Sequence, residues 1–136
     1  MTPKQISVVK QTWAQVVPIS DQAAALFYGR LFELDPSLSS LFSGDMVAQG
    51  KKLMSMLNTA VSTLDVMANL TPALQALGKR HVGYGVKAAD YDTVGAALLW
   101  TLEQGLQEGY TEEVAEAWTQ AYATLAGVMV EAAAEG

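Results

Sequence analysis

The sequence predicts an all-α protein that forms one domain. Apolar side chains recur at three- and four-residue steps along most of the chain, which is the spacing that one face of a helix produces. No segment alternates apolar and polar residues over the length of a strand, and no Asn-Gly or Asp-Gly hairpin turn occurs. The chain has 136 residues, a length that suits a single domain with its own core. We therefore expect one domain over residues 1–136, with six or seven helices and no sheet.

The N-terminal part predicts two helices and a short helical turn. Thr2-Pro3-Lys4-Gln5 fits a capping box with proline in the first helical position, and the apolar run that follows stops at Pro18. A second helix is expected over residues 21–34, because its apolar positions form one broad stripe. Asp35-Pro36 ends this helix and opens a short turn of helix that carries Phe42.

The middle of the chain predicts two further helices joined by a loose connection. Ser43-Gly44-Asp45 is typical of a turn, and a third helix is expected after it. The apolar face of that helix comprises Gly50, Leu53, Met54, Leu57 and Val61. Periodicity is weaker over residues 62–70, and Thr71-Pro72 then predicts a capped start for a fourth helix, which Gly83 and Gly85 end.

The C-terminal part predicts the last two helices. Asp90 is expected to cap the first of them, which closes at Gly109. Its apolar stripe comprises Val94, Leu98, Thr101 or Leu102, and Leu106. Thr111 is expected to cap the last helix, because the carboxylates of Glu112 and Glu113 then interact favourably with the helix dipole. The stripe of this helix comprises Val114, Trp118, Ala121, Tyr122, Leu125 and Val128.

Composition excludes several classes of site. The chain has no cysteine and one histidine, so disulfides, thiolate metal sites and any site that needs two imidazoles from one subunit are excluded. A net charge of −6 argues against a surface that coats DNA or RNA, which needs a basic face. There is no run of about 18 apolar residues and no secretory signal at the start, so we expect neither a membrane span nor export. The simplest expectation is a cytoplasmic protein.

Charge is unevenly distributed along the chain. Residues 1–87 carry all eight Lys and Arg residues and five acidic residues, whereas residues 88–136 carry nine acidic residues and no Lys or Arg. Because the length argues against two domains, this pattern indicates an acidic, solvated face on the last two helices.

His81 is the residue that most needs an explanation. It follows Leu77 by four residues and Leu74 by seven, so the three side chains share one face of a helix. One interpretation is a core histidine bonded to a backbone carbonyl. The other is a metal ligand, since a neutral imidazole can hold one axial position of a haem iron. Position alone leaves both interpretations open.

Other site types find less support in the residues. No Gly-x-Ser-x-Gly elbow, Gly-rich phosphate loop or dinucleotide fingerprint occurs. Glu112, Glu113 and Glu116 fit an exposed first helical turn better than a pair of catalytic carboxylates. Met54 offers a thioether, but filling a gap in the core explains it better than metal ligation.

Several stretches taken together resemble the globin family. The likeness rests on LGKRHVGYGV at residues 77–86 and on Phe42 after a short Pro-initiated helix. Further matching stretches are residues 25–32, 51–54, 91–95 and 117–122. The resemblance is greatest to bacterial single-domain globins, the haem domains of flavohaemoglobins, and neuroglobins. It implies a globin fold around a pocket for haem b, and it favours the ligand interpretation of His81.

The resemblance assigns one group of residues to the iron and the porphyrin. His81 falls at the family's proximal iron ligand, and Leu77 precedes it by one turn on the same face. Phe42 falls at the phenylalanine that stacks on the haem. Val86, in the corner after the proximal helix, is expected to pack on the porphyrin.

A second group falls on the distal side and at the mouth. Tyr28 falls where bacterial members have a distal tyrosine, Gln49 at the distal polar position, and Leu53 one turn later over the iron. The resemblance implies that Tyr28 and Gln49 donate hydrogen bonds to bound O2, and that Lys52 meets a haem propionate. The alternatives are that Tyr28 and Leu53 only face the core of a helical bundle, and that Gln49 is exposed.

Three features depart from these relatives. His81 is the only histidine, so the bis-histidyl haem of neuroglobins is excluded within one chain and a five-coordinate ferrous iron is expected. The sequence contains no flavin reductase domain, so any electron donor is expected to be a separate protein. The glutamate that flavohaemoglobins place beside the proximal tyrosine and histidine corresponds to Ala133, with Glu131 two residues away.

The resemblance implies a haem protein that reversibly binds O2, nitric oxide and carbon monoxide, as a monomer or a homodimer. The alternative is a nitric oxide dioxygenase, in which nitric oxide and bound O2 give nitrate and a separate reductase resets the iron. A third interpretation is a haem-free helical regulatory domain. The lack of the proximal glutamate and of a reductase domain in the sequence favours O2 binding. Whether the protein is an enzyme stays open.

Overall fold

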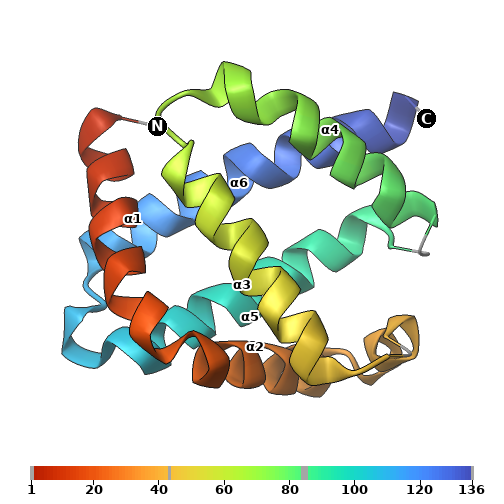
Figure 1. Ribbon diagram of the computed structural model, residues 1–136, viewed down its shortest axis with the longest axis horizontal. Coiled ribbons are helices and arrows are strands. Elements are labelled where there is room, and N and C mark those ends of the chain that lie inside the picture. The colour runs from red at the N-terminus through yellow and green to blue at the C-terminus, as the bar shows by residue number, and fades with distance from the viewer. Residues whose placement is uncertain (1, 43, 84–85, 136) are drawn as a thin grey trace.

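The computed structural model describes residues 2–42, 44–83 and 86–135, and these residues form helices without any strand, which confirms the all-α prediction (Figure 1). The helices are α1 (Pro3–Val16), η1 (Val17–Ile19), α2 (Ser20–Leu34), η2 (Pro36–Leu41), α3 (Met46–Ser62), α4 (Met67–Gly83), α5 (Ala88–Leu106), η3 (Gln107–Gly109) and α6 (Glu112–Glu135), the three η elements being short 3-10 helices. In Figure 1, α3 runs diagonally across the front, with α4 above it and α2 below.

Two hydrophobic clusters hold the helices together. The main cluster takes buried side chains from every long helix except α4, among them Val9, Phe27, Leu102 and Trp118. The smaller cluster attaches α4 to the other helices and comprises Ala60, Leu70, Leu74, Tyr91 and Met129. None of the helices in the described part of the chain is long and apolar enough to cross a membrane. The buried side chains of α4 thus belong to the smaller cluster, while Met67 at its start also packs against the main one.

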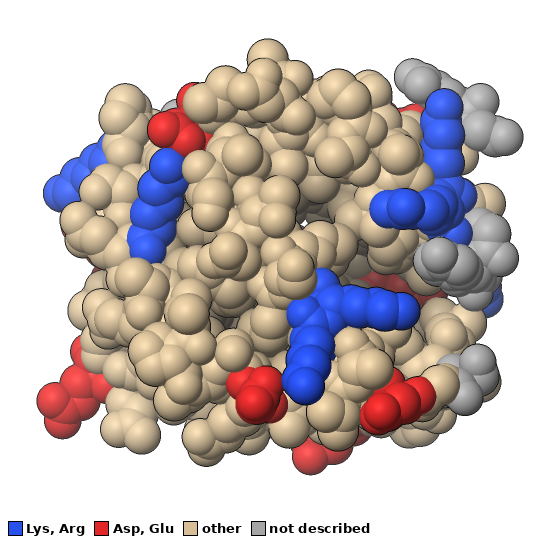
Figure 2. Space-filling model, viewed as in Figure 1, with Lys and Arg blue, Asp and Glu red and all other residues tan. Residues whose placement is uncertain are grey.

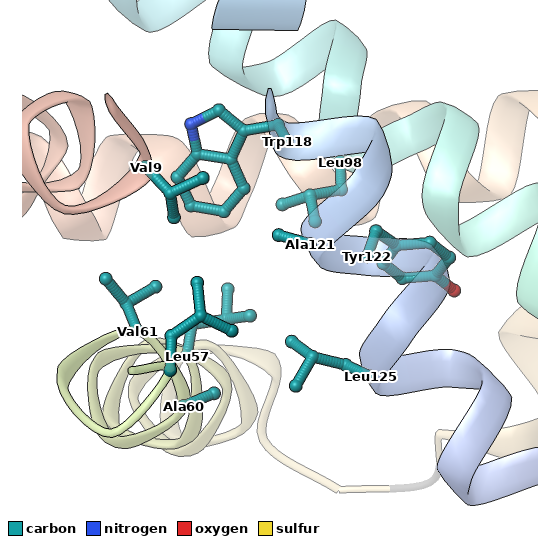
Figure 3. Close-up of a pocket in the computed structure, with 10 residues that line it drawn as sticks. Val9, Leu57, Ala60, Val61, Leu98, Trp118, Ala121, Tyr122 and Leu125 are labelled. Carbon is teal, nitrogen blue, oxygen red and sulfur yellow. The ribbon is translucent and has the colours of Figure 1, made fainter. Parts of the chain in front are cut away.

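Two buried tryptophans fasten α1 to its neighbours. The indole nitrogen of Trp118 donates to the hydroxyl of Thr12 at 2.8 Å, and that of Trp13 donates to the side-chain carbonyl of Asn58 at 3.0 Å. Trp118 also lines a small apolar cavity of about 30 Å³ between α1, α3, α5 and α6 (Figure 3). These bonds satisfy the two indole N–H groups, whose burial without a partner would be costly.

Two of the four helix N-caps that the sequence predicts, at Thr2 and Thr111, are confirmed. The hydroxyl of Thr2 accepts from the backbone N–H of Gln5 at 3.1 Å, and the side chain of Gln5 accepts in return from the N–H of Thr2 at 3.0 Å, which completes the expected capping box. Thr111 caps α6 through a 3.3 Å bond from the N–H of Val114. Gly83 ends α4 as expected, whereas Gly85 and the Ser43 part of the predicted turn lie outside the described residues.

The start of α4 corrects the prediction for residues 62–71. The helix begins at Met67, so Pro72 lies inside it and not at its first position. The hydroxyl of Thr71 donates to the carbonyl of Met67 at 2.8 Å instead of capping a new helix. Leu70 is buried in the smaller cluster with Leu74, one turn later on the same face. Burial of this face stabilises the extra turn although proline removes a backbone hydrogen bond from it.

The start of α5 also differs from the prediction. Asp90 is the third residue of the helix and not its cap, because α5 begins at Ala88. The Asp90 carboxylate accepts from the backbone N–H of Lys87 at 2.8 Å, so it still satisfies an N–H group at the helix start, from inside the first turn.

Gly78 permits the closest contact between α4 and α6. A Cβ atom at this position would lie 2.4 Å from the carbonyl oxygen of Met129 and 2.8 Å from its Cα, and both are backbone atoms that cannot turn away. Gly50 plays a similar part between α3 and α2, where a Cβ would lie 2.9 Å from that of Ala24. Both crossings therefore depend on the absence of a side chain.

We expect Gly78→Ala to destabilise the protein by about 1–3 kcal/mol, the usual cost of overpacking a close contact. Gly127→Ala is the matched control, because this glycine lies inside α6 with nothing within 4 Å of an added Cβ. The control should be neutral or gain up to about 1 kcal/mol from its better helix propensity. Urea unfolding measures both, and equal stabilities would show that the α4–α6 contact does not need glycine.

Candidate functional site

One large pocket opens between α2, α3, α4, α5 and α6. Its volume is about 680 Å³, within the range of cofactor and small-molecule sites. All eight residues that the sequence singled out line this pocket, namely Tyr28, Phe42, Gln49, Lys52, Leu53, Leu77, His81 and Val86. The tertiary structure thus brings the predicted site residues together, while their roles toward a cofactor remain predictions.

His81 lies in the last turn of α4 and is half-buried. Its Nδ1 lies 2.8 Å from the backbone carbonyl oxygen of Leu77. Because a carbonyl only accepts, Nδ1 carries a proton, and in the neutral ring Nε2 holds the lone pair that binds metals. The bond to a carbonyl that is expected of a core histidine is therefore present. The same bond is the one that orients a histidine ligand, so both interpretations fit this geometry.

Tyr28 and Gln49 form the polar part of another wall. The side-chain nitrogen of Gln49 donates to the hydroxyl oxygen of Tyr28 at 3.3 Å. Gln49 is half-buried, so the interpretation of it as an exposed residue is wrong. Burial raises the pKa of the Tyr28 hydroxyl above its ordinary value, and the bond from Gln49 lowers it by less. The hydroxyl therefore keeps its proton at neutral pH and can donate it to a polar ligand.

An aromatic group fixes the position of Phe42. Its ring meets the ring of Tyr28 edge to face, with centroids 5.3 Å apart and planes at 70°. Its centroid also lies 5.7 Å from that of Phe32. Such pairs contribute about 0.5–1.5 kcal/mol beyond the area they bury. Phe42 is thus held against the pocket before any ligand enters.

Sequence reasoning missed a pair of tyrosines beside His81. The rings of Tyr91 and His81 stack at 30°, with centroids 6.3 Å apart. The hydroxyl of Tyr91 is buried and has no hydrogen-bond partner among the described residues. The hydroxyl of Tyr122 on α6 donates to the backbone carbonyl of Tyr91 at 2.5 Å.

Gly95 makes room for this pair, because a Cβ there would lie 2.7 Å from the ring of Tyr122. The sequence signals were present, since Tyr91 and Gly95 belong to a stretch that resembles globins and Tyr122 lies on the stripe of the last helix. Periodicity shows which face of a helix a residue occupies but not which other helix that face contacts. The contact between Tyr91 of α5 and Tyr122 of α6 was therefore not predictable from periodicity.

Charged side chains surround the mouth of the pocket. Lys52 and Arg80 line it together with Asp45 and Asp90. Both carboxylates accept from backbone N–H groups at helix starts, Asp45 at 2.9 Å and Asp90 at 2.8 Å. Figure 2 shows basic side chains gathered on this face, over α3 and near the C-terminal end of α4. The mouth can therefore hold anionic groups of a ligand whose body lies in the apolar interior.

The wall that α6 contributes is almost entirely apolar. It comprises Tyr122, Leu125, Ala126 and Met129. Ala133 is half-buried and carries no polar group, and Glu131 is exposed. Ala133, which corresponds to the proximal glutamate of flavohaemoglobins, thus offers no carboxylate to the His81 side of the pocket.

Comparison with known proteins shows similarity to globins over most of the chain. The family model described as Globin matches residues 25–129 of the chain. Neuroglobin-1 and neuroglobin-2 of Oncorhynchus mykiss are each 29% identical to the chain over 143 residues, which cover 95% of this chain and 90% of the relative. Neuroglobin of Tetraodon nigroviridis is 28% identical with the same coverage. The match thus includes nearly the whole pocket-forming part of the molecule.

The Tyr122 hydroxyl gives the stability a testable dependence on pH. Burial raises the pKa of Tyr122 well above its ordinary value, and the nearby Tyr91 and Asp92 raise it further. The unfolded chain therefore loses this proton first, near pH 10, so the contribution of Tyr122 to stability is complete below pH 10 and is lost as the pH rises further. Urea unfolding between pH 8 and about pH 11 should show a smaller alkaline loss for Tyr122→Phe than for the wild type. Identical alkaline losses would contradict this assignment.

Proposed function

Because the chain belongs to the globin family, we propose that its pocket binds haem b through His81 and that the haem protein reversibly binds O2 and other diatomic gases. The bound haem would supply the iron at which such a gas coordinates. The observation that carries the proposal is that His81 lines the large pocket together with Phe42 and Tyr28. The bond between Nδ1 of His81 and the carbonyl of Leu77 agrees with this role. It fixes the tautomer and the orientation of a ring that lines the pocket, which is how proteins prepare a histidine ligand.

The residues present fit a haem in two respects. The pocket of about 680 Å³ is mostly apolar, as a porphyrin requires. Lys52 and Arg80 stand at its mouth, where propionate carboxylates reach water.

Tyr28 and Gln49 would select the ligand. The Tyr28 hydroxyl accepts from Gln49 and keeps its own proton, so it can donate to a partly negative atom inside the pocket. Hydrogen bonds to charged or strongly polarised acceptors contribute about 1.5–3 kcal/mol each. O2 becomes more polar than carbon monoxide when it binds to ferrous haem, so this wall favours O2. The bond from Gln49 holds the Tyr28 hydroxyl in place for that contact.

The proximal wall favours gas binding over nitric oxide dioxygenase chemistry. The group that orients His81 is a neutral backbone carbonyl, and α6 contributes Ala133 and an exposed Glu131 near its C-terminal end. A carboxylate bonded to the ring would raise the basicity of the imidazole more than a carbonyl does. The arrangement therefore supports a stable ligand complex more than rapid oxidative turnover.

Replacing the proximal ligand should abolish or greatly weaken haem binding. We expect His81→Gly to lose haem on purification, or to bind it only when imidazole is added. Val82→Gly is the control, because it places the same helix-weakening residue next in α4 at a side chain that is 50% exposed. The absorption spectrum after haem reconstitution measures both. An unchanged ferrous spectrum for His81→Gly would overturn the assignment, and no Soret band for the wild type would leave a haem-free domain.

Removing the distal hydroxyl should weaken O2 binding selectively. Tyr28→Phe keeps the ring and its contact with Phe42, so it should speed O2 release by roughly 10- to 150-fold, which corresponds to one hydrogen bond to a polarised acceptor. Gln49→Leu should have a smaller effect, and the two effects should not add fully because the two side chains are bonded to each other. Stopped-flow release of O2 measures the effect, and carbon monoxide release serves as the control. If neither variant releases O2 more than about twofold faster, the distal assignment is wrong.

A further inference from the structure

We propose that the basic rim of the pocket is a docking surface for an acidic one-electron carrier of the ferredoxin type. The inference rests on the proposed function, because it requires a redox-active iron in the pocket. In the step concerned, one electron leaves the reduced iron–sulfur cluster of the partner and reduces ferric iron to ferrous iron. We define the basic rim as Lys51 and Lys52 of α3, Lys79 and Arg80 of α4, and Lys87 before α5.

The rim residues differ from the other cations in their pairing. Three of the eight Lys and Arg residues form ion pairs elsewhere, namely Lys4 with Glu113, Lys10 with Asp65 and Arg30 with Glu33. The five residues of the basic rim form no ion pair with the described residues, and all five are exposed. Figure 2 shows basic side chains over α3 and the end of α4, with acidic side chains beside those over α3. This region therefore carries unneutralised positive charge.

A haem would neutralise only part of this charge. Its two propionates carry two negative charges, and the two rim residues that line the pocket are Lys52 and Arg80. Lys51, Lys79 and Lys87 lie outside the pocket lining, so they remain for a partner in water. The nearest acids of the mouth, Asp45 and Asp90, are bonded to backbone N–H groups of α3 and of Lys87. The two propionates and the two carboxylates carry four negative charges against the five positive charges of the rim, so the rim keeps one net positive charge after the haem has entered.

Five of the fourteen acidic residues form a group at the other end of the molecule. Glu103 and Glu108 lie at the C-terminal end of α5 and in η3, and Glu112, Glu113 and Glu116 begin α6. In Figure 1 this junction lies at the left, opposite the end of α4. A net charge of −6 would repel an acidic protein if the charge were evenly spread. The segregation instead orients such a partner toward the mouth, where its electron has the shortest path to the pocket.

The rim also offers apolar contact. Met56 lines the pocket and is 38% exposed, so it can pack on a partner at the opening. Small, weak interfaces with an apolar centre and a charged edge are usual for electron carriers that must dissociate quickly. An acidic carrier matches both the charge and the position of this surface.

The test measures reduction of the ferric, haem-loaded protein by a reduced acidic [2Fe–2S] ferredoxin under stopped flow. We compare Lys51→Gln/Lys79→Gln with Lys4→Gln/Lys10→Gln, which changes the net charge equally but away from the rim. At low ionic strength the rim variant should react at least about fivefold more slowly than the wild type, and the control variant within about twofold of it. Added salt should slow the wild type and remove the difference.

Two further arms separate the possible failures. At high salt, where charges are screened, dithionite should reduce all three proteins at one rate. A titration of the haem-free chain with ferredoxin, followed by NMR, should shift residues of the basic rim. A chain that takes up no haem therefore refutes the proposed function, and the titration still tests the docking surface. Equal slowing by both double variants, or binding of the rim to anionic phospholipid vesicles in preference to ferredoxin, would overturn the proposal.

Discussion

The approach of α4 to α6 at Gly78 is the contact on which the geometry of the pocket depends. The backbone of Met129 occupies the space that a Cβ on Gly78 would need. His81 follows three residues later on the same helix, so the distance between the two helices sets the position of the imidazole relative to the rest of the pocket. Leu70 and Leu74 hold the same helix in the smaller hydrophobic cluster. The helix that carries His81 is thus fixed by backbone contact and apolar burial.

Backbone carbonyls, and not side-chain carboxylates, orient the functional groups around His81. The carbonyl of Leu77 accepts from the His81 ring, and that of Tyr91 accepts from the hydroxyl of Tyr122. A helix carbonyl is already held by the helical backbone, so it orients a ring without the entropy cost of ordering a side chain. It is also uncharged, so it fixes geometry without burying a charge beside the apolar wall. The His81 ring and the Tyr122 hydroxyl are therefore held in position without a buried charge beside them.

The pocket has few polar groups: uncharged ones lie inside it and charged ones lie at its mouth. Inside, the hydroxyl of Tyr28 and the amide of Gln49 satisfy part of each other's hydrogen-bonding capacity and so reduce the cost of burial. At the mouth, Lys52 and Arg80 keep their charges in water, where a charge costs little. Low dielectric inside the pocket strengthens the interactions of its donors with a ligand, whereas solvent screens the charges of the rim.

The sequence by itself determined the local features of this protein. The all-α class and the caps at Thr2 and Thr111 were predictable because capping and periodicity depend on neighbours in the chain. The resemblance to globins, and not periodicity, pointed to eight of the residues that line the pocket. Only the tertiary structure decided that α4 begins at Met67, that Tyr122 bonds to Tyr91, and that Gly78 meets Met129. Each of these depends on burial or contact between residues far apart in sequence, and such contacts exist only after the helices have packed.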